Sequence, residues 1–169
     1  MWINSGATFE PATSDSFKAE PCVLTVDDDE DALGYLSDLL SLSGFNPITA
    51  NSGERALEYF SKIKPDIVLT DIQMPGMDGM KLLKTIRDID DTTPVIMLTG
   101  HGEMENAIKA LRLGAYDFLL KPINTEILIS TLEKAAEHCR LKMLENEYTH
   151  RLEAQVAATH LRRVHGNKE

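Results

Sequence analysis

The sequence predicts an α/β protein in which five parallel strands form a doubly wound, three-layer sheet in the order 2-1-3-4-5, followed by a long C-terminal helical extension. From residue 22 onward, short apolar runs rich in β-branched residues alternate five times with segments of helical periodicity. The runs are apolar throughout, which is typical of parallel strands covered by helices on both faces. Because crossovers between parallel strands are right-handed, few topologies remain, and this strand order is the most economical.

The individual elements follow from local signals. Strands are predicted at the apolar runs 22–26, 47–50, 67–70, 94–98 and 116–120. The helices between them are bounded by capping and breaking residues: acids at 29–31 fit a helix first turn, Ser52 fits an N-cap, Pro65 closes a helix, and Gly44 and Gly114 fit helix C-termini. Helices are therefore predicted at 30–43, 53–63, 80–89, 103–113 and from 124 onward.

Composition excludes several classes of function. A net charge of −10 argues against a nucleic-acid-binding face and against binding to an anionic membrane surface. No apolar run approaches the ~18 residues of a membrane-spanning helix. Cys22 and Cys139 fit no metal-binding spacing and are expected to be reduced, structural thiols of a cytoplasmic protein. Residues 1–20 are rich in Ser, Thr, Pro and Ala, which indicates a disordered leader, either native or an expression remnant.

Polar and charged residues follow four of the predicted strands. Asp27 and Asp28 come after the first strand, Asp71 after the third, Thr99 after the fourth and Lys121 after the fifth. Because ligands of parallel α/β sheets bind outside the carboxyl ends of the strands, these side chains are expected to meet at one edge. Carboxylates, a hydroxyl and an ammonium group together suit a divalent cation and a phosphoryl group.

These residues lie in motifs that resemble the receiver domain of two-component response regulators. The resemblance covers residues 22–134 and rests on four segments in the family's order: Val26-Asp27-Asp28-Asp29, Asp71-Ile72-Gln73-Met74-Pro75-Gly76-Met77-Asp78-Gly79, Leu98-Thr99-Gly100 and Lys121-Pro122. The family's fold is flavodoxin-like, which agrees with the predicted sheet. We therefore divide the chain into a leader (1–20), a receiver domain (21–134) and a helical extension (135–169).

The resemblance implies a role for each site residue. Asp71 would be the phosphoryl acceptor, because a carboxylate can act as nucleophile and form an acyl phosphate. Mg²⁺, or Mn²⁺ in its place, would be bound by Asp28, by Asp71 and by the backbone carbonyl of Gln73, with Asp27 acting through water. Lys121, which precedes a proline whose peptide bond is cis in the family, would pair with Asp71 and then with a phosphoryl oxygen.

Four further roles concern switching and dephosphorylation. Thr99 would donate its hydroxyl to a phosphoryl oxygen. Phe118 occupies the position of a switch aromatic that packs inward when Thr99 is drawn to the phosphate; equally, it fits a plain core residue. Gln73 and His101 flank the site and would influence how water reaches the acyl phosphate. For His101 the alternative is an exposed loop residue without a catalytic role.

The resemblance implies a signalling module and not an enzyme. It would accept a phosphoryl group from a sensor histidine kinase or a phosphotransfer protein, and switch conformation to control an attached or partner output. The alternative from another class is an aspartyl-phosphate phosphatase or phosphotransferase. Haloacid-dehalogenase-like enzymes carry a second acid two residues after the nucleophile, and this chain has Gln73 there, which argues against the alternative.

The last predicted helix continues beyond the receiver domain. An apolar stripe with spacings of 3, 4, 4 and 4 resembles a coiled coil with a stutter and comprises Leu141, Leu144, Tyr148, Leu152 and Val156. A homodimer through this helix is expected; the alternative is a single, unpartnered helix. The extension resembles helices that join receivers to output domains and, loosely, those of cyclic-di-GMP phosphodiesterase regulators, for which this chain would be a dimerisation module. Nothing after Val156 has the composition of an output domain.

Overall fold

The computed structural model describes residues 20–100, 102 and 104–165, with the backbone alone for residues 160–165. Its elements are β1 (Cys22–Val26), α1 (Glu30–Leu42), β2 (Asn46–Ala50), α2 (Gly53–Ile63), β3 (Ile67–Asp71), α3 (Gly79–Ile89), β4 (Val95–Thr99), α4 (Met104–Arg112), β5 (Asp117–Leu120) and α5 (Thr125–His165). The bounds of these elements agree with the predicted ones to within one residue. Apart from Glu20, the predicted leader lies outside the described residues.

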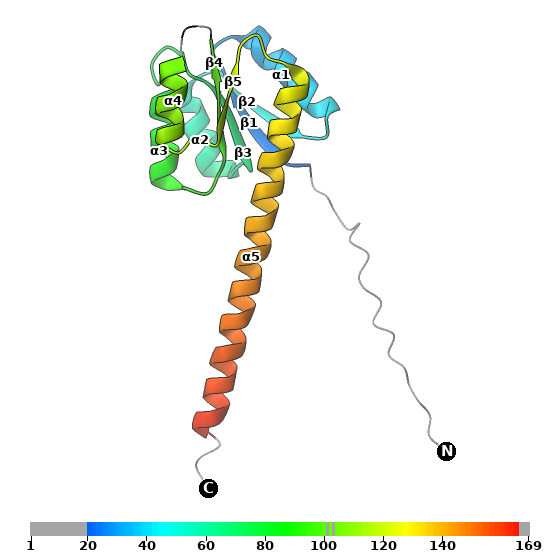
Figure 1. Ribbon diagram of the computed structural model, residues 1–169, viewed down its shortest axis with the longest axis vertical. Helices are drawn as coiled ribbons and strands as arrows, with labels where there is room; N and C mark the ends of the chain where they lie inside the picture. Colours follow the sequence, from blue (N-terminus) through cyan, green and yellow to red (C-terminus); the bar gives the residue numbers. More distant parts are fainter. Residues whose placement is uncertain (1–19, 101, 103, 166–169) are drawn as a thin grey trace, which may run out of the picture.

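The sheet has the predicted topology. All pairings are parallel, and the strand order is β2-β1-β3-β4-β5. Helices α1 and α5 cover one face of the sheet, and α2, α3 and α4 cover the other (Figure 1). The predicted α/β, doubly wound fold is confirmed.

Two apolar layers hold the helices to the sheet. β3 and β4 are buried along their whole length, so each contributes side chains to both layers. On the α2–α4 face the largest buried groups include Phe60, Leu82 and Ile86. On the α1–α5 face they include Leu36, Leu40 and Leu128. Burying a side chain of this size contributes about 1.5–3 kcal/mol, so these layers fix the positions of the strand ends that carry the polar residues.

Strands β3 and β4 each extend one residue further than predicted, and the extra residues are Asp71 and Thr99. Asp71 pairs in register with Leu98, and Thr99 pairs with Leu120. Both polar residues are therefore held by the sheet itself and not by flexible loops. Their backbone positions are set by strand pairing before any ligand binds.

The helix ends carry the predicted capping groups. The Asp29 carboxylate accepts hydrogen bonds from Asp31 N at 2.9 Å and Ala32 N at 3.3 Å at the start of α1. The Ser52 hydroxyl accepts from Arg55 N at 3.2 Å at the start of α2. Asp29 is thereby used as a cap, which leaves its two neighbours on the N-terminal side for the site.

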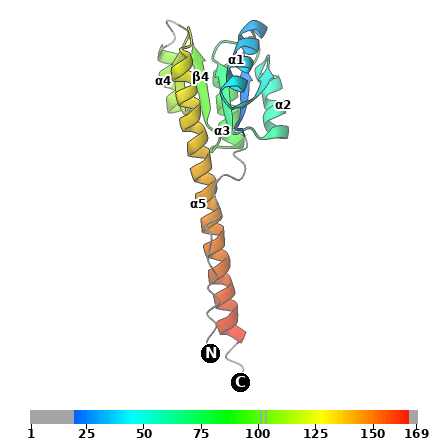
Figure 2. The ribbon, with the colours of Figure 1, turned by 90° about the vertical axis from the view of Figure 1, so that its right-hand side faces the viewer.

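Helix α5 consists of two parts with different environments. Its first part packs on the sheet through Leu128, Leu132 and Ala135. From Arg140 to Thr159 every side chain is exposed, and this part of the helix projects away from the sheet (Figures 1 and 2). The boundary that we placed at residue 134 thus lies within one continuous helix. None of the described helices combines the length and the apolar character that crossing a membrane requires.

One buried hydroxyl gives a stability prediction. Among the described residues, Thr25 Oγ1 on β1 is buried and has no hydrogen-bond partner. An unsatisfied buried hydroxyl costs about 1–3 kcal/mol, so Thr25→Val should raise the free energy of unfolding by about 1 kcal/mol, measured by urea denaturation. Thr70→Val is the control, because the Thr70 hydroxyl donates to Asp71 O at 3.0 Å and its removal should not stabilise. A loss of stability in Thr25→Val would contradict the prediction.

Candidate functional site

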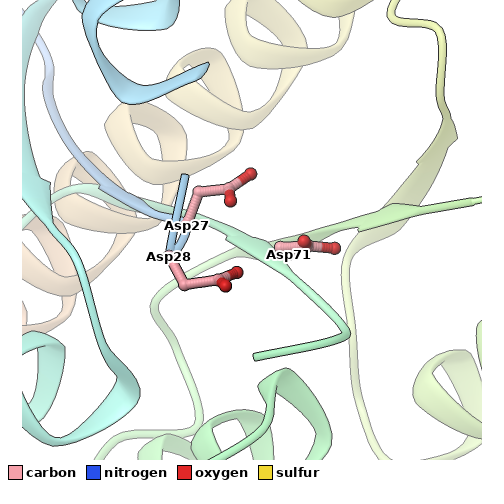
Figure 3. Close-up of side chains that lie close together, drawn as sticks. All are labelled: Asp27, Asp28 and Asp71. Carbon is pink, nitrogen blue, oxygen red and sulfur yellow. The ribbon is translucent and has the colours of Figure 1, made fainter. Parts of the chain in front are cut away.

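Three carboxylates gather at the carboxyl end of the sheet (Figure 3). Val26 pairs in register with Thr70, so the residues that follow them, Asp27 and Asp71, emerge side by side from neighbouring strands. Asp28 comes next in the chain. One carboxylate oxygen from each of the three aspartates lies within 4.8 Å of the others. The structure therefore brings together the three acids that the sequence selected.

The three acids differ in exposure. Asp27 is buried, Asp71 is at the limit of burial and Asp28 is exposed. Backbone N–H groups hold two of the carboxylates, because Asp29 N donates to Asp27 Oδ1 at 3.0 Å and Gln73 N donates to Asp71 Oδ1 at 3.4 Å. One acid is thus open to solvent, and two are fixed by their surroundings.

Lys121 supplies positive charge to this cluster. Its Nζ lies 3.1 Å from Asp71 Oδ2 and 3.2 Å from Asp27 Oδ2. The backbone of Lys121 is fastened to β4, because its N–H donates to Thr99 O at 2.8 Å. The peptide bond between Lys121 and Pro122 is cis, as the resemblance implied. One ammonium group among three carboxylates leaves the cluster negative, which favours binding of a further cation.

Burial and charge shift two pKa values in the site. Burial raises the pKa of the Asp71 carboxyl above the ordinary value for aspartate, and this effect outweighs the opposing hydrogen bond and charge of Lys121. Burial on its own lowers the pKa of Lys121, but the hydrogen bond and charge of Asp71, together with Asp27, outweigh it and raise that pKa. The ionised form of Asp71 is therefore costly in the folded chain, and Lys121 remains an ammonium at neutral pH.

Of the other predicted site residues, the structure describes three, Thr99, Phe118 and Gln73. Thr99 is fully buried at the end of β4, next to the strand that carries Asp71. Phe118 is half-buried and packs against the apolar layer under α2, α3 and α4. Gln73 is exposed directly after Ile72. His101 lies outside the described residues, so its predicted role has no structural description.

The donor set fits a hard divalent cation. Carboxylate and backbone carbonyl oxygens are the ligands that Mg²⁺ prefers, and Mg²⁺ keeps several waters that a phosphoryl oxygen can replace. The described cluster contains no histidine or cysteine, the ligands that zinc and copper favour. The acidic triad of Asp27, Asp28 and Asp71 could hold such a cation.

Sequence reasoning missed one group of residues around the loop that follows β3. Glu54 accepts a hydrogen bond from Met77 N at 3.0 Å, across 23 residues of sequence. Gly53 lies against the Met77 backbone. In the sequence, an acid in the first turn of a helix indicates only a favourable interaction with the helix dipole. Nothing local predicts the tertiary contact.

Comparisons with known protein families agree with this geometry. A family model described as "Response regulator receiver domain" matches residues 23–133. Among curated relatives, the regulatory protein AtoC of Escherichia coli K12 is 41% identical over 128 residues, which is 76% of this chain and 27% of AtoC. The C4-dicarboxylate transport transcriptional regulatory protein DctD of Pseudomonas aeruginosa is 40% identical over 130 residues, 77% of this chain and 28% of DctD. The chain thus spans less than a third of the length of either relative.

Solved structures give the same result. A response regulator receiver domain protein from Clostridium thermocellum superposes with a TM-score of 0.69 at 35% identity, covering 73% of this chain and 98% of that protein. NtrX from Brucella abortus superposes with a TM-score of 0.72 at 35% identity, covering 77% of this chain and 30% of NtrX. The similarity therefore includes nearly all of a solved receiver domain and one part of a longer regulator.

Proposed function

Because this chain belongs to the response regulator receiver family, we propose that it accepts a phosphoryl group on Asp71 and changes conformation in response. The observation that carries the proposal is the position of the Asp71 carboxylate, in an acidic cluster with Lys121 Nζ at 3.1 Å. Receiver domains are phosphoryl acceptors and not classical enzymes. We propose residues 21–134 as the receiver unit and residues 135–169 as an extension with a separate role.

The proposed reaction transfers a phosphoryl group to a carboxylate oxygen of Asp71. The oxygen attacks phosphorus, the bond from phosphorus to the donor nitrogen breaks, and the neutral imidazole of the donor leaves after protonation. A bound Mg²⁺ would neutralise charge on the phosphoryl oxygens. Asp28, Asp71 and the Gln73 carbonyl would hold this cation, and Asp27 would orient one of its waters.

Lys121 and Thr99 would bind the transferred group. Lys121 Nζ already contacts Asp71, and a phosphoryl oxygen on Asp71 would take over this contact. The Thr99 hydroxyl, at the end of the neighbouring strand, would donate to a second phosphoryl oxygen. Phe118, half-buried on β5, would then pack further inward as Thr99 moves, and Gln73 and His101 would set how readily water reaches the acyl phosphate.

The phosphodonor would be a phosphohistidine on a sensor kinase or a phosphotransfer protein, in the cytoplasm. The alternative function as a phosphatase would require a second acid two residues after the nucleophile, and this chain has glutamine at position 73.

The relatives AtoC and DctD are named as regulators, and DctD as a transcriptional one. These names favour gene regulation over cyclic-di-GMP turnover as the output that this domain would control. No direct contact with nucleic acid or membrane is proposed for the described part of the chain.

The exposed half of α5 supports a further role in self-association. Its apolar stripe comprises side chains that are 44–68% exposed: Leu141, Leu144, Tyr148, Leu152 and Val156. A lone helix would leave this stripe in water. We propose that a second copy of the chain covers it in a parallel coiled-coil dimer, which would bring two receiver domains close together.

Intact mass spectrometry tests the phosphoryl acceptor role without knowledge of the kinase. Incubation with acetyl phosphate and Mg²⁺ should add the mass of one phosphoryl group, and the product should be labile to base and hydroxylamine. Omitting Mg²⁺ and adding a chelator should prevent the gain. A stable adduct, or a gain that does not depend on a divalent cation, would contradict acyl phosphate formation at this site.

Metal binding should depend on the two N-terminal acids to different degrees. Asp28→Ala removes a direct ligand and should weaken Mg²⁺ binding more than Asp27→Ala, which removes an outer partner. We expect the loss for Asp28→Ala to be at least about tenfold, measured by titration calorimetry. Equal affinities for wild type and Asp28→Ala would contradict the proposed ligand set.

A further inference from the structure

The loop between β3 and α3 carries the proposed metal ligand Gln73, and hydrogen bonds hold it near its end and in its middle. Near its end, Gly79 N donates to Ile72 O at 2.8 Å, which closes the loop on itself. A Cβ atom at position 79 would clash with the backbone oxygen of Asp71, so only glycine permits this approach. In the middle of the loop, Met77 N donates a hydrogen bond at 3.0 Å to Glu54 Oε1, which belongs to helix α2 and lies outside the loop.

The start of α2 fits closely against this loop. A Cβ atom at position 53 would lie 2.6 Å from Met77 O, which is a backbone atom that cannot move without moving the loop. Gly76 has a φ of +72°, a conformation that favours glycine, and a Cβ atom there would lie 2.9 Å from Glu54 Oε1. The first turn of α2 and the loop are therefore in direct contact, through the Gly53 backbone and the Glu54 carboxylate.

This contact bears on metal binding because it holds the backbone at Met77, in the same loop as Gln73, while Met74 anchors the first half of that loop in the apolar core. Gln73 follows the acceptor strand by two residues, and Met77 lies four residues later. Glu54 is exposed, and its carboxylate accepts a hydrogen bond from the loop backbone at Met77 N. A carboxylate that accepts from a backbone N–H makes a stronger bond than a neutral acceptor does. Its removal would free the middle of the loop while the sheet and the acidic cluster stay in place.

We propose that Glu54, together with Gly53, is a positioning residue that holds the β3–α3 loop so that the Gln73 carbonyl can ligate Mg²⁺. The inference rests on the proposed phosphoryl acceptor function of the same site. Glu54 touches neither the cation nor the phosphoryl group. Its contribution is to remove the cost of ordering the loop when the cation binds.

The test compares variants at Glu54 by Mg²⁺ affinity and by phosphorylation rate with acetyl phosphate. Glu54→Ala should weaken Mg²⁺ binding by about tenfold, the size of effect seen when an outer partner of a metal ligand is removed. Phosphorylation of this variant should be slow at low Mg²⁺ and should return to the wild-type rate at saturating Mg²⁺. A purely structural defect would not be corrected by the cation.

Matched variants separate positioning from charge. Glu54→Gln keeps an oxygen that accepts from Met77 N, although as a weaker, neutral acceptor, and should bind Mg²⁺ clearly more tightly than Glu54→Ala does. Glu58→Ala removes a charge from the same helix without touching the loop and should have no effect. Gly53→Ala should weaken binding as Glu54→Ala does, whereas Gly34→Ala adds a methyl group where nothing lies within 4 Å and should not.

The outcomes are distinguishable. Unchanged Mg²⁺ affinity in Glu54→Ala would overturn the inference, and so would a Glu54→Gln variant as weak as Glu54→Ala, because the effect would then be one of charge. Neither result would bear on the proposed function, because that function is tested by phosphorylation of the wild-type protein. Wild-type protein that takes up no phosphoryl group from acetyl phosphate at saturating Mg²⁺ would instead overturn the proposed function.

Discussion

Asp71→Asn is expected to abolish phosphorylation by acetyl phosphate and Mg²⁺ completely. The amide has nearly the same shape as the carboxylate, but it offers no anionic oxygen to attack phosphorus, so no acyl phosphate forms. The fold should persist, since Asp71 is held by strand pairing with β4. Intact mass spectrometry should detect no gain in the variant under conditions in which the wild type gains one phosphoryl group.

The same substitution should stabilise the metal-free protein. Burial raises the pKa of Asp71, so at neutral pH the ionised carboxylate is disfavoured in the folded state relative to the unfolded state. Asn removes this penalty, and the midpoint of thermal unfolding should rise. The gain should disappear as the pH falls below the ordinary aspartate pKa, where the group is neutral in both states.

Asp38→Asn is the matched control for both results. Asp38 is exposed on α1, so the substitution makes the same chemical change away from the site. It should leave phosphorylation and thermal stability as in the wild type. Undiminished labelling of Asp71→Asn would show that another residue accepts the phosphoryl group.

Removing the extension should convert a dimer into a monomer. Burying a large apolar side chain contributes about 1.5–3 kcal/mol at best, and the stripe offers five such side chains per chain, so micromolar dimers are expected after the cost of association. Sedimentation should give a dimer for residues 1–169 and a monomer for a chain that ends near Lys134. Monomers in both cases would contradict the coiled coil, and dimers in both would place the contact on the receiver domain.

Substitutions within the full chain refine this test. Leu144→Gln and Leu152→Gln together should abolish the dimer, because both leucines lie on the stripe. Met143→Gln is the control, because Met143 is 66% exposed and lies beside the stripe and not on it. A dimer that tolerates the double substitution would require a contact on another face of α5.

The sequence predicted the sheet well because its signals are local. Apolar runs, capping residues and glycines mark each element, and right-handed crossovers then restrict the topology. The prediction stopped one residue short in β3 and β4, since a polar residue is ordinarily a sign that a strand has ended. Asp71 and Thr99 remain within their strands because the neighbouring strand continues to pair with them.

The acidic cluster was predictable once the strands were placed, because the carboxyl ends of neighbouring strands in a parallel sheet meet at one edge. The strand ends also predicted that Lys121 would lie near the acids, and the resemblance to receivers predicted its pairing with Asp71. Its contact with Asp27, 94 residues away in the sequence, was not predicted. The contact between Glu54 and the β3–α3 loop had no signal in the sequence. This contact depends on where the start of α2 lies relative to that loop, and hydrophobic periodicity in the sequence does not predict how two elements are placed relative to each other.

Locating the phosphoryl group in the chain tests the proposed function most directly. Protein treated with acetyl phosphate and Mg²⁺ can be reduced with borohydride, which converts an aspartyl phosphate to homoserine, and then digested for peptide mass spectrometry. The modification should be found at position 71, with the other two acids of the cluster, Asp27 and Asp28, unmodified. Modification at any other residue, or none at position 71 in protein that has gained the phosphoryl mass, would contradict the assignment of Asp71 as the acceptor.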